Sequence, residues 1–207
     1  HRCFNYSFSA GQVREFTAFA RYTQARGADP RLVFVNVDAE HFRKDATRRL
    51  NIPSFIALRQ RPPNVMESYL TYDALGFSLG MLMGMRPNAR FYDARFLGDV
   101  VPGAAQYHYQ ELVVAGMVGG AYDGAASADF AELRAVFPSA RYIAFVAPVS
   151  RMIVARREAE GTLQGLLDAQ YAAAALFDAM HDFSVPSAIT ADSRNYYDDG
   201  HFHRYIY

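Results

Sequence analysis

Two short apolar runs limit the fold of this chain more than any other feature of its sequence. Residues 32–38 read LVFVNVD, and residues 142–148 read YIAFVAP. The first run is almost continuously β-branched or aromatic, as expected for a strand buried on both faces, and the second reads as another strand that ends at a proline. Between the runs, residues 127–136 have the pattern of a helix that ends before Pro138. Strands alternating with helices predict an α/β fold with a mainly parallel sheet.

Further helices and strands are expected on both sides of these runs. Residues 3–9 alternate large apolar with small polar side chains, like a short strand, and a period near 3.6 predicts an amphipathic helix from Val13 to Gly27. Residues 163–180 predict a long helix rich in Ala and Leu, with a short strand around 181–185 after it. Residues 191–203 read as a polar and aromatic loop. This order of elements fits an α/β fold with a parallel sheet.

The middle of the chain is less regular than its two ends. Prolines interrupt it repeatedly, and we interpret residues 43–128 as a mostly helical insertion within a single domain that spans residues 1–207. Inside the insertion, residues 66–85 read as one helix and residues 107–117 as another.

Composition excludes several classes of function. The chain carries 21 basic and 21 acidic residues, so its net charge is zero and no long-range field would attract nucleic acid or an anionic membrane. Its single cysteine, Cys3, excludes an intrachain disulfide. The most apolar windows, residues 74–85 and 112–121, are shorter than the roughly 20 residues of a membrane-spanning helix. The first residue is His1 rather than Met, so we expect a preceding segment.

Ligands of an open α/β sheet bind beyond the carboxyl ends of its parallel strands, so the loops there are the first places to look for chemistry. They include Gly11, residues 38–41 and residues 148–150, as well as the loop near the carboxyl terminus. Asp38 directly follows a predicted strand, where it could orient a catalytic group or cap a turn.

The loop near the carboxyl terminus contains the strongest local signal. Asp198 lies three residues before His201, close enough for its carboxylate to fix the tautomer of the imidazole and stabilise the protonated ring. An exposed loop with an incidental charged pair is the alternative reading. A metal site formed by His201, His203, Asp198 and Asp199 is a less favoured one, because the other histidines are scattered along the chain.

Five segments spread over most of the chain carry a family resemblance. They are NYSFSAG at residues 5–11, LVFVNVD at 32–38, SYLTYDALGFSL at 68–79, IAFVAP at 143–148 and NYYDDGHF at 195–202. Together these segments resemble the SGNH/GDSL hydrolase superfamily. The resemblance is to its bacterial cell-envelope branch, which includes polysaccharide O-acetyltransferases and the D-alanine transfer protein of teichoic acid synthesis. It implies a flavodoxin-like three-layer sandwich with a mainly parallel sheet.

The resemblance also implies roles for individual residues. Asp198 and His201 match the family's catalytic pair, which acts with a serine nucleophile, and Gly11 matches the residue whose backbone N–H stabilises the oxyanion. The family's serine precedes the block that matches residues 5–11, so we assign no serine of this chain and expect truncation at both ends. The family's Gly-x-Asn-Asp block is replaced here by DAEHF at residues 38–42, where Asp38 is retained as a candidate oxyanion or substrate residue.

The function implied is that of a serine esterase or O-acyltransferase acting on an acylated cell-envelope glycan or a similar small ester. It needs no cofactor and no metal. A non-catalytic SGNH-like protein that binds polysaccharide or an envelope assembly partner is the alternative. The resemblance implies a location in the bacterial periplasm or cell envelope, and it does not exclude the cytoplasm. It is also compatible with a membrane anchor in the expected N-terminal segment.

Overall fold

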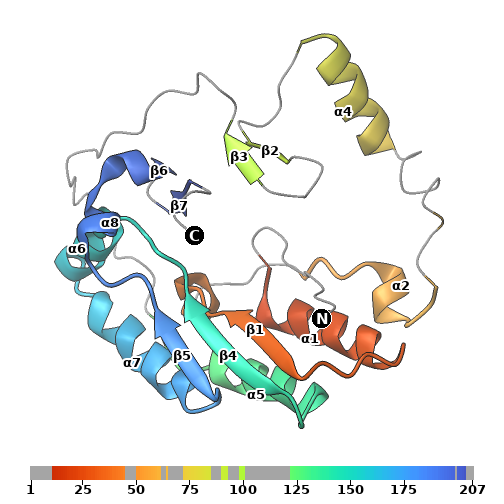
Figure 1. Cartoon of the computed structure of the whole chain (residues 1–207), viewed down its shortest axis with the longest axis horizontal. Helices are drawn as coiled ribbons and strands as arrows, with labels where there is room; N and C mark the ends of the chain where they lie inside the picture. Colours follow the sequence, from red (N-terminus) through yellow and green to blue (C-terminus); the bar gives the residue numbers. More distant parts are fainter. Residues whose placement is uncertain are drawn as a thin grey trace.

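A small parallel sheet organises the chain (Figure 1). The computed structural model describes residues 11–44, 50–61, 64, 72–84, 90–92, 98–100, 122–198 and 200–203. Strands β1 (Leu32–Asn36), β4 (Arg141–Val146) and β5 (Ala179–Asp182) lie in the order β1-β4-β5, and both neighbouring pairs are parallel. The predicted α/β class with a parallel sheet is therefore confirmed.

Helices and two small hairpins complete the described part. The helices are α1 (Val13–Gln24), α2 (Ser54–Ala57), α4 (Tyr72–Leu82), α5 (Ala126–Val136), α6 (Arg151–Ala159), α7 (Leu163–Ala174) and α8 (Ala188–Ala191), with 3-10 turns η1 (Ala39–Phe42) and η2 (Ser193–Asn195). The antiparallel hairpins join β2 (Arg90–Tyr92) to β3 (Gly98–Val100) and β6 (Tyr196–Asp198) to β7 (His201–Phe202).

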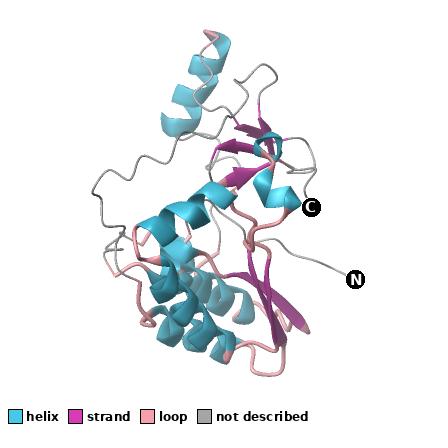
Figure 2. Ribbon diagram, turned by 90° about the vertical axis from the view of Figure 1, so that its left-hand side faces the viewer, coloured by secondary structure: helices cyan, strands magenta, loops and turns pink. Residues whose placement is uncertain are grey.

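The hydrophobic core lies between one face of the sheet and the helices α1, α5 and α7. Side chains alternate between the two faces of a strand, and on β1 and β4 the residues that face the helices are buried, including Val35, Tyr142 and Ala144. Phe130 from α5 is fully buried in the same cluster. Figure 2 shows the helices gathered on this side of the sheet.

On the opposite face of the sheet, described residues of β1 are exposed while Ile143 and Phe145 of β4 are half-buried, which corrects the expectation that the first strand is buried on both faces. On β1, Leu32 is 43% exposed and Phe34 is 65% exposed. The apolar run predicted the strand correctly, but no helix of the described part covers this face. The described sheet and helices therefore form two layers.

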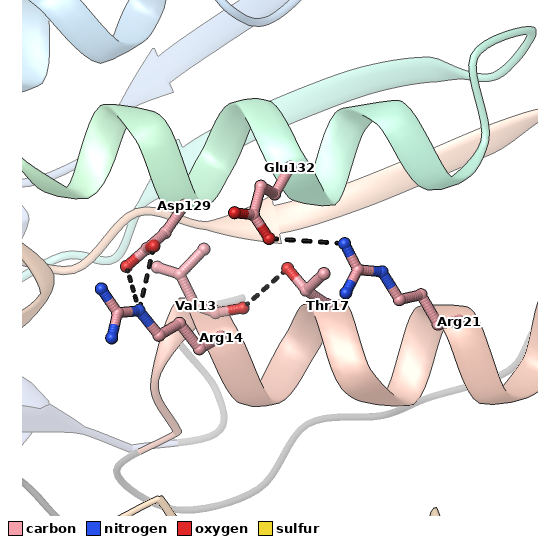
Figure 3. A network of polar contacts seen from close by, with 6 residues as sticks. All are labelled: Val13, Arg14, Thr17, Arg21, Asp129 and Glu132. Atoms are coloured by element: carbon pink, nitrogen blue, oxygen red, sulfur yellow. Dashed lines mark hydrogen bonds and ion pairs between the residues drawn. The ribbon is translucent and has the colours of Figure 1, made fainter. Parts of the chain in front are cut away.

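Helices α1 and α5 pack side by side over the sheet, with ion pairs along their outer edge (Figure 3). The Arg14 guanidinium lies 3.0 Å from the Asp129 carboxylate, and that of Arg21 lies 3.4 Å from Glu132. Exposed ion pairs of this kind contribute about 0–1 kcal/mol each to stability. Apolar packing between the helices therefore contributes more to holding them together. Beneath them the buried Thr17 hydroxyl donates to a backbone carbonyl one turn earlier in α1.

The boundary between α7 and β5 differs from the sequence-based expectation of a helix over residues 163–180. Helix α7 ends at Ala174, and β5 begins at Ala179 because it pairs with β4 from that residue onward. Between them, the Asp178 carboxylate accepts the backbone N–H of Tyr142 at 2.7 Å and is paired with Arg134 at 3.1 Å. These contacts lower the pKa of Asp178 below its usual range and hold the chain at the entrance to β5.

The other expectations have mixed outcomes. The helices and strands now called α1, β1, α5 and β4 were expected, and α4 lies inside the helix expected at residues 66–85, whereas α6 was not expected at all. The segment expected to be a loop near the carboxyl terminus contains the β6–β7 hairpin instead. The strand expected at residues 3–9 and the helix expected at 107–117 fall outside the described residues.

The core predicts a measurable effect for one hydroxyl group. Tyr142 is fully buried on β4, and its hydroxyl donates to the Leu133 carbonyl of α5 at 3.1 Å. Because Tyr142→Phe leaves that carbonyl without this partner, we expect it to lower the free energy of unfolding by about 0.5–1.5 kcal/mol in urea titrations. Tyr171→Phe is the matched control, since Tyr171 on α7 is 84% exposed, and equal effects for the two variants would contradict this role.

Candidate functional site

The carboxyl ends of the three parallel strands open onto one edge of the sheet. In Figure 1 the arrowheads of β1, β4 and β5 point toward the side on which α6, α8 and the β6–β7 hairpin lie. The loop after β1 contains Asp38 and the turn η1, and the loop after β4 ends at Ser150. The loops that the sequence singled out around residues 38–41 and 148–150 therefore both lie at this edge, which we call the carboxyl edge.

His41 joins two of the predicted site residues. Its Nδ1 accepts the backbone N–H of Asp38 at 3.1 Å, and its Nε2 donates to the carbonyl of Gly11 at 3.1 Å. The ring packs edge-on against Phe16 of α1 and Phe130 of α5, with centroids 5.7 and 5.8 Å away. Gly11 and Asp38 are thus brought together through a histidine to which sequence reasoning gave no role.

The two hydrogen bonds also fix the protonation state of His41. Because Nδ1 accepts a backbone N–H, the single proton of the neutral ring must reside on Nε2. Burial lowers the pKa of His41 below its ordinary value of 6.5, and this effect exceeds the opposing influence of the Gly11 carbonyl and of the Asp38 and Glu40 carboxylates. With both nitrogens occupied, His41 is a positioning residue for the turn at Gly11 and is not suited to be a general base.

Glu15 holds the same turn from its other side. Its carboxylate is buried at the start of α1 and accepts the backbone N–H of Gln12 at 2.7 Å, one half of an N-terminal capping box. Its second oxygen accepts the backbone N–H of Asn51, which lies in the segment before α2, 36 residues later in the chain. Gly11 is therefore anchored by His41 on its carbonyl and by Glu15 on the next residue.

The β6–β7 hairpin carries the predicted catalytic pair. Asp198 and His201 are cross-strand partners in the antiparallel register of this hairpin, and the His201 side chain is exposed. Tyr196 is buried at the start of the hairpin, and the backbone N–H of His203 donates to the Asn195 carbonyl at 2.8 Å. The hairpin therefore has a buried anchor at Tyr196 and an exposed His201, which occupies the backbone position opposite Asp198.

A charged turn precedes this hairpin. Arg194 donates to the side chain of Asp192 through both its guanidinium and its backbone N–H, and the two groups lower the pKa of Asp192 to about 2. This carboxylate stays ionised over the physiological range and stabilises the turn η2 that leads into β6.

Two buried polar atoms at the carboxyl edge have no hydrogen-bond partner in the described part of the chain. They are Oδ1 of Asn36, the last residue of β1, and Oγ of Ser150, which is fully buried directly before α6. Buried polar groups without partners are uncommon and cost about 1–3 kcal/mol each. Nothing in the sequence assigns either atom a role. Each stands out only in the folded structure, where it is buried without a hydrogen-bond partner among the described residues.

No group of three or more His, Cys, Asp or Glu side chains among the described residues is arranged to hold a metal ion. Asp199, one member of the alternative metal site, lies outside the described residues. No helix within the described ranges is long and apolar enough to cross a membrane.

Comparisons of the chain with protein-family models, with curated proteins and with solved structures found no match.

The partly buried His41 predicts a pH dependence of stability. Its folded-state pKa is lowered, so on acidification the unfolded chain takes up a proton first, near pH 6.5, and the folded state is progressively destabilised as the pH falls below that value. Urea titrations of wild type should show this loss, and His41→Asn should reduce it because Asn can still accept the Asp38 N–H but does not titrate. A wild-type slope in His41→Asn would remove His41 as its source.

The hydrogen bonds of Glu15 predict a larger effect. Glu15→Ala leaves the backbone N–H groups of Gln12 and Asn51 without their acceptor, so we expect the free energy of unfolding at pH 7 to fall by about 2–4 kcal/mol. Glu132→Ala removes a carboxylate that is 63% exposed on α5 and should change it by less than about 0.5 kcal/mol. Equal losses in the two variants would show that Glu15 does not anchor the turn.

Proposed function

We propose that this chain carries the base half of a Ser-His-Asp acyl-transfer site, with His201 as the general base and Asp198 as the residue that orients it. The observation that carries this proposal is the register of the β6–β7 hairpin, in which the two residues are cross-strand partners. Such positions have Cβ atoms about 5 Å apart, a separation across which a carboxylate can reach an imidazole. The hairpin lies beyond the carboxyl ends of the parallel strands, where α/β folds bind their ligands.

The sheet supports the SGNH-like fold implied by the resemblance. In a flavodoxin-like sheet of order 2-1-3-4-5, the last three strands are neighbours in chain order and parallel. Strands β1, β4 and β5 have this arrangement, and the crossovers between them place α5 and α7 on one face. We therefore propose that the two observed layers belong to a three-layer sandwich, whose third layer would lie over the open face that contains Phe34.

The proposed reaction is acyl transfer through a covalent intermediate. The nucleophile implied by the resemblance is a serine that precedes residue 1. Its oxygen attacks the ester carbonyl while His201 takes its proton, and His201 then gives that proton to the departing alcohol as the ester C–O bond breaks. Water, or a sugar hydroxyl, next attacks the acyl-enzyme and releases the acid or a new ester.

Gly11 is the proposed oxyanion donor. An N–H that points at the developing negative charge is effective only when it is held in place beforehand. The turn that begins at Gly11 is held by His41 and Glu15, which supports this role. Asp38 is held by the same histidine through its backbone, so we propose it as a residue that lines the substrate side of this turn.

The proposed substrate is an acylated glycan of the bacterial cell envelope or a similar small ester, and the proposed location is the envelope or periplasm. Both come from the resemblance. The zero net charge agrees with a neutral ester and gives no reason to expect a nucleic acid partner. The proposed chemistry uses side chains and a backbone N–H of the protein and no cofactor.

A fluorophosphonate probe tests this function on the natural gene product, including any segment that precedes residue 1. We expect a single serine to be labelled, at a rate lowered by at least about 10³-fold in His201→Ala and about 10²-fold or more in Asp198→Asn, but less than about threefold in the matched hairpin control His203→Ala. Mass spectrometry of the labelled peptide identifies the serine.

Two outcomes would overturn the assignment. Labelling that persists in His201→Ala would remove His201 from the mechanism. A gene product that folds but is never labelled would instead favour the non-catalytic SGNH-like protein that binds polysaccharide or an assembly partner.

A further inference from the structure

Asn195 makes three hydrogen bonds at the point where the chain enters the β6–β7 hairpin. Its backbone N–H donates to the Asp192 carbonyl at 3.1 Å, and its own carbonyl accepts the backbone N–H of His203 at 2.8 Å. Its side-chain Nδ2 donates to the carbonyl of Ile189, inside α8, at 2.8 Å. A carbonyl oxygen can only accept, so the nitrogen of the Asn195 amide must face Ile189. Asn195 thus connects α8 with the two ends of the hairpin.

Helix α8 is held by hydrogen bonds of its own. The side chains of Ser187 and Thr190 form a capping box, in which the Ser187 N–H donates to Thr190 Oγ1 at 2.7 Å and the Thr190 N–H donates to Ser187 Oγ at 3.3 Å. Thr190 is fully buried. Buried polar groups that are hydrogen-bonded in this way make the local structure rigid. The Ile189 carbonyl therefore belongs to a well-held turn of helix.

The hairpin needs contacts outside itself to fix its position. In the described part of the chain, β6 and β7 form a two-stranded sheet that is separate from the three-stranded parallel sheet, and α8 lies beside it (Figure 1). A two-stranded hairpin is marginally stable by itself. Its register is also irregular between Tyr196 and Asp198. The position of the hairpin therefore depends on the groups that join it to the rest of the protein, which include the buried ring of Tyr196 and the side-chain amide of Asn195.

We propose that Asn195 is a positioning residue for His201. Its side-chain amide holds the hairpin on α8, and the hairpin in turn sets where the His201 imidazole lies at the carboxyl edge. Misplacing a catalytic group by about 1 Å can lower a rate about 10²-fold, so one hydrogen bond at the base of the hairpin is enough to affect catalysis. This role rests on the acyl-transfer function proposed above, and in it Asn195 acts only through the hairpin.

Fluorophosphonate labelling of the natural gene product tests this role. The maximal labelling rate reports how well the base is placed, and the probe concentration at half the maximal rate reports binding. We expect Asn195→Ala to lower the maximal rate about tenfold and to change the half-saturating concentration by less than about twofold. Gln164→Ala is the matched control, because it removes another exposed side-chain amide, which donates to Asp168 on α7 at 2.8 Å, and it should be labelled like wild type.

Two further variants separate the hydrogen-bond donor from the shape of the side chain. Asn195→Asp has the same shape but places a carboxylate oxygen opposite the Ile189 carbonyl, so its maximal labelling rate should fall at least as far as that of Asn195→Ala. Asn195→Gln keeps the amide donor and should restore the rate to within about threefold of wild type. A wild-type rate in Asn195→Asp, or a rate in Asn195→Gln no higher than in Asn195→Ala, would contradict the role of the donor.

Amide hydrogen exchange distinguishes a failure of this positioning role from a failure of the acyl-transfer function, because it requires no catalysis. If the Asn195 amide holds the hairpin, the backbone N–H of His203 should exchange at least about tenfold faster in Asn195→Ala than in wild type. The backbone N–H of Val37, which donates to the Phe145 carbonyl at 2.8 Å in the parallel sheet, should exchange at the same rate in both proteins.

The possible results have different consequences. An unchanged exchange rate at His203, or an unchanged maximal labelling rate, in Asn195→Ala would overturn the positioning role. Equally faster exchange at Val37 would indicate a general loss of stability and would also contradict it. Faster exchange at His203 in a protein whose wild type is never labelled would refute the acyl-transfer function and uphold the contact that holds the hairpin. If Asn195→Ala loses cooperative unfolding, Asn195→Asp takes its place in both measurements.

Discussion

The pairing of β4 with a parallel strand on each side is the interaction on which the rest of the structure depends. Because β1, β4 and β5 run in the same direction, the chain must cross back after each strand, and the helices of these crossovers lie on one face. Every second residue of β4 is consequently buried beneath α5 and α7, including the fully buried Tyr142 and Ala144. The same parallel direction brings the loops after the strands to a single edge, so the core and the candidate site have one common cause.

At that edge, hydrogen bonds from His41 and Glu15 hold the turn at Gly11 and the loop after β1. The local sequence of these loops does not determine their conformation. A neutral His41 connects the turn at Gly11 with the loop after β1, and Glu15 connects the same turn with Asn51. Glu15 is buried and His41 is partly buried, and away from water a hydrogen bond is stronger and a missing partner more costly. The β6–β7 hairpin is different, since it buries Tyr196 and leaves His201 accessible, as a group that meets a substrate must be.

Local patterns predicted the elements whose period or apolar run is visible within the segment itself. Period and apolar content were enough for α1, α5, β1 and β4. Spacing together with position after the last predicted strand singled out Asp198 and His201, whose catalytic role stays a prediction. The boundary of α7 could not be predicted, because its Ala-rich run continues toward a strand whose start is decided by pairing with β4. Burial on both faces of β1 was also inferred wrongly, since an apolar strand reads the same whether or not a helix covers its second face. The role of His41 depends on Gly11, thirty residues earlier in the chain, and no local pattern shows that contact.

The most direct test of the acyl-transfer site is the crystal structure of the natural gene product after reaction with a fluorophosphonate. The proposed site predicts a phosphorus atom bound to a serine Oγ that lies within hydrogen-bonding distance, about 3 Å, of an imidazole nitrogen of His201, at the carboxyl edge of the sheet. An adduct on a serine remote from the β6–β7 hairpin would contradict the assignment of His201 and Asp198.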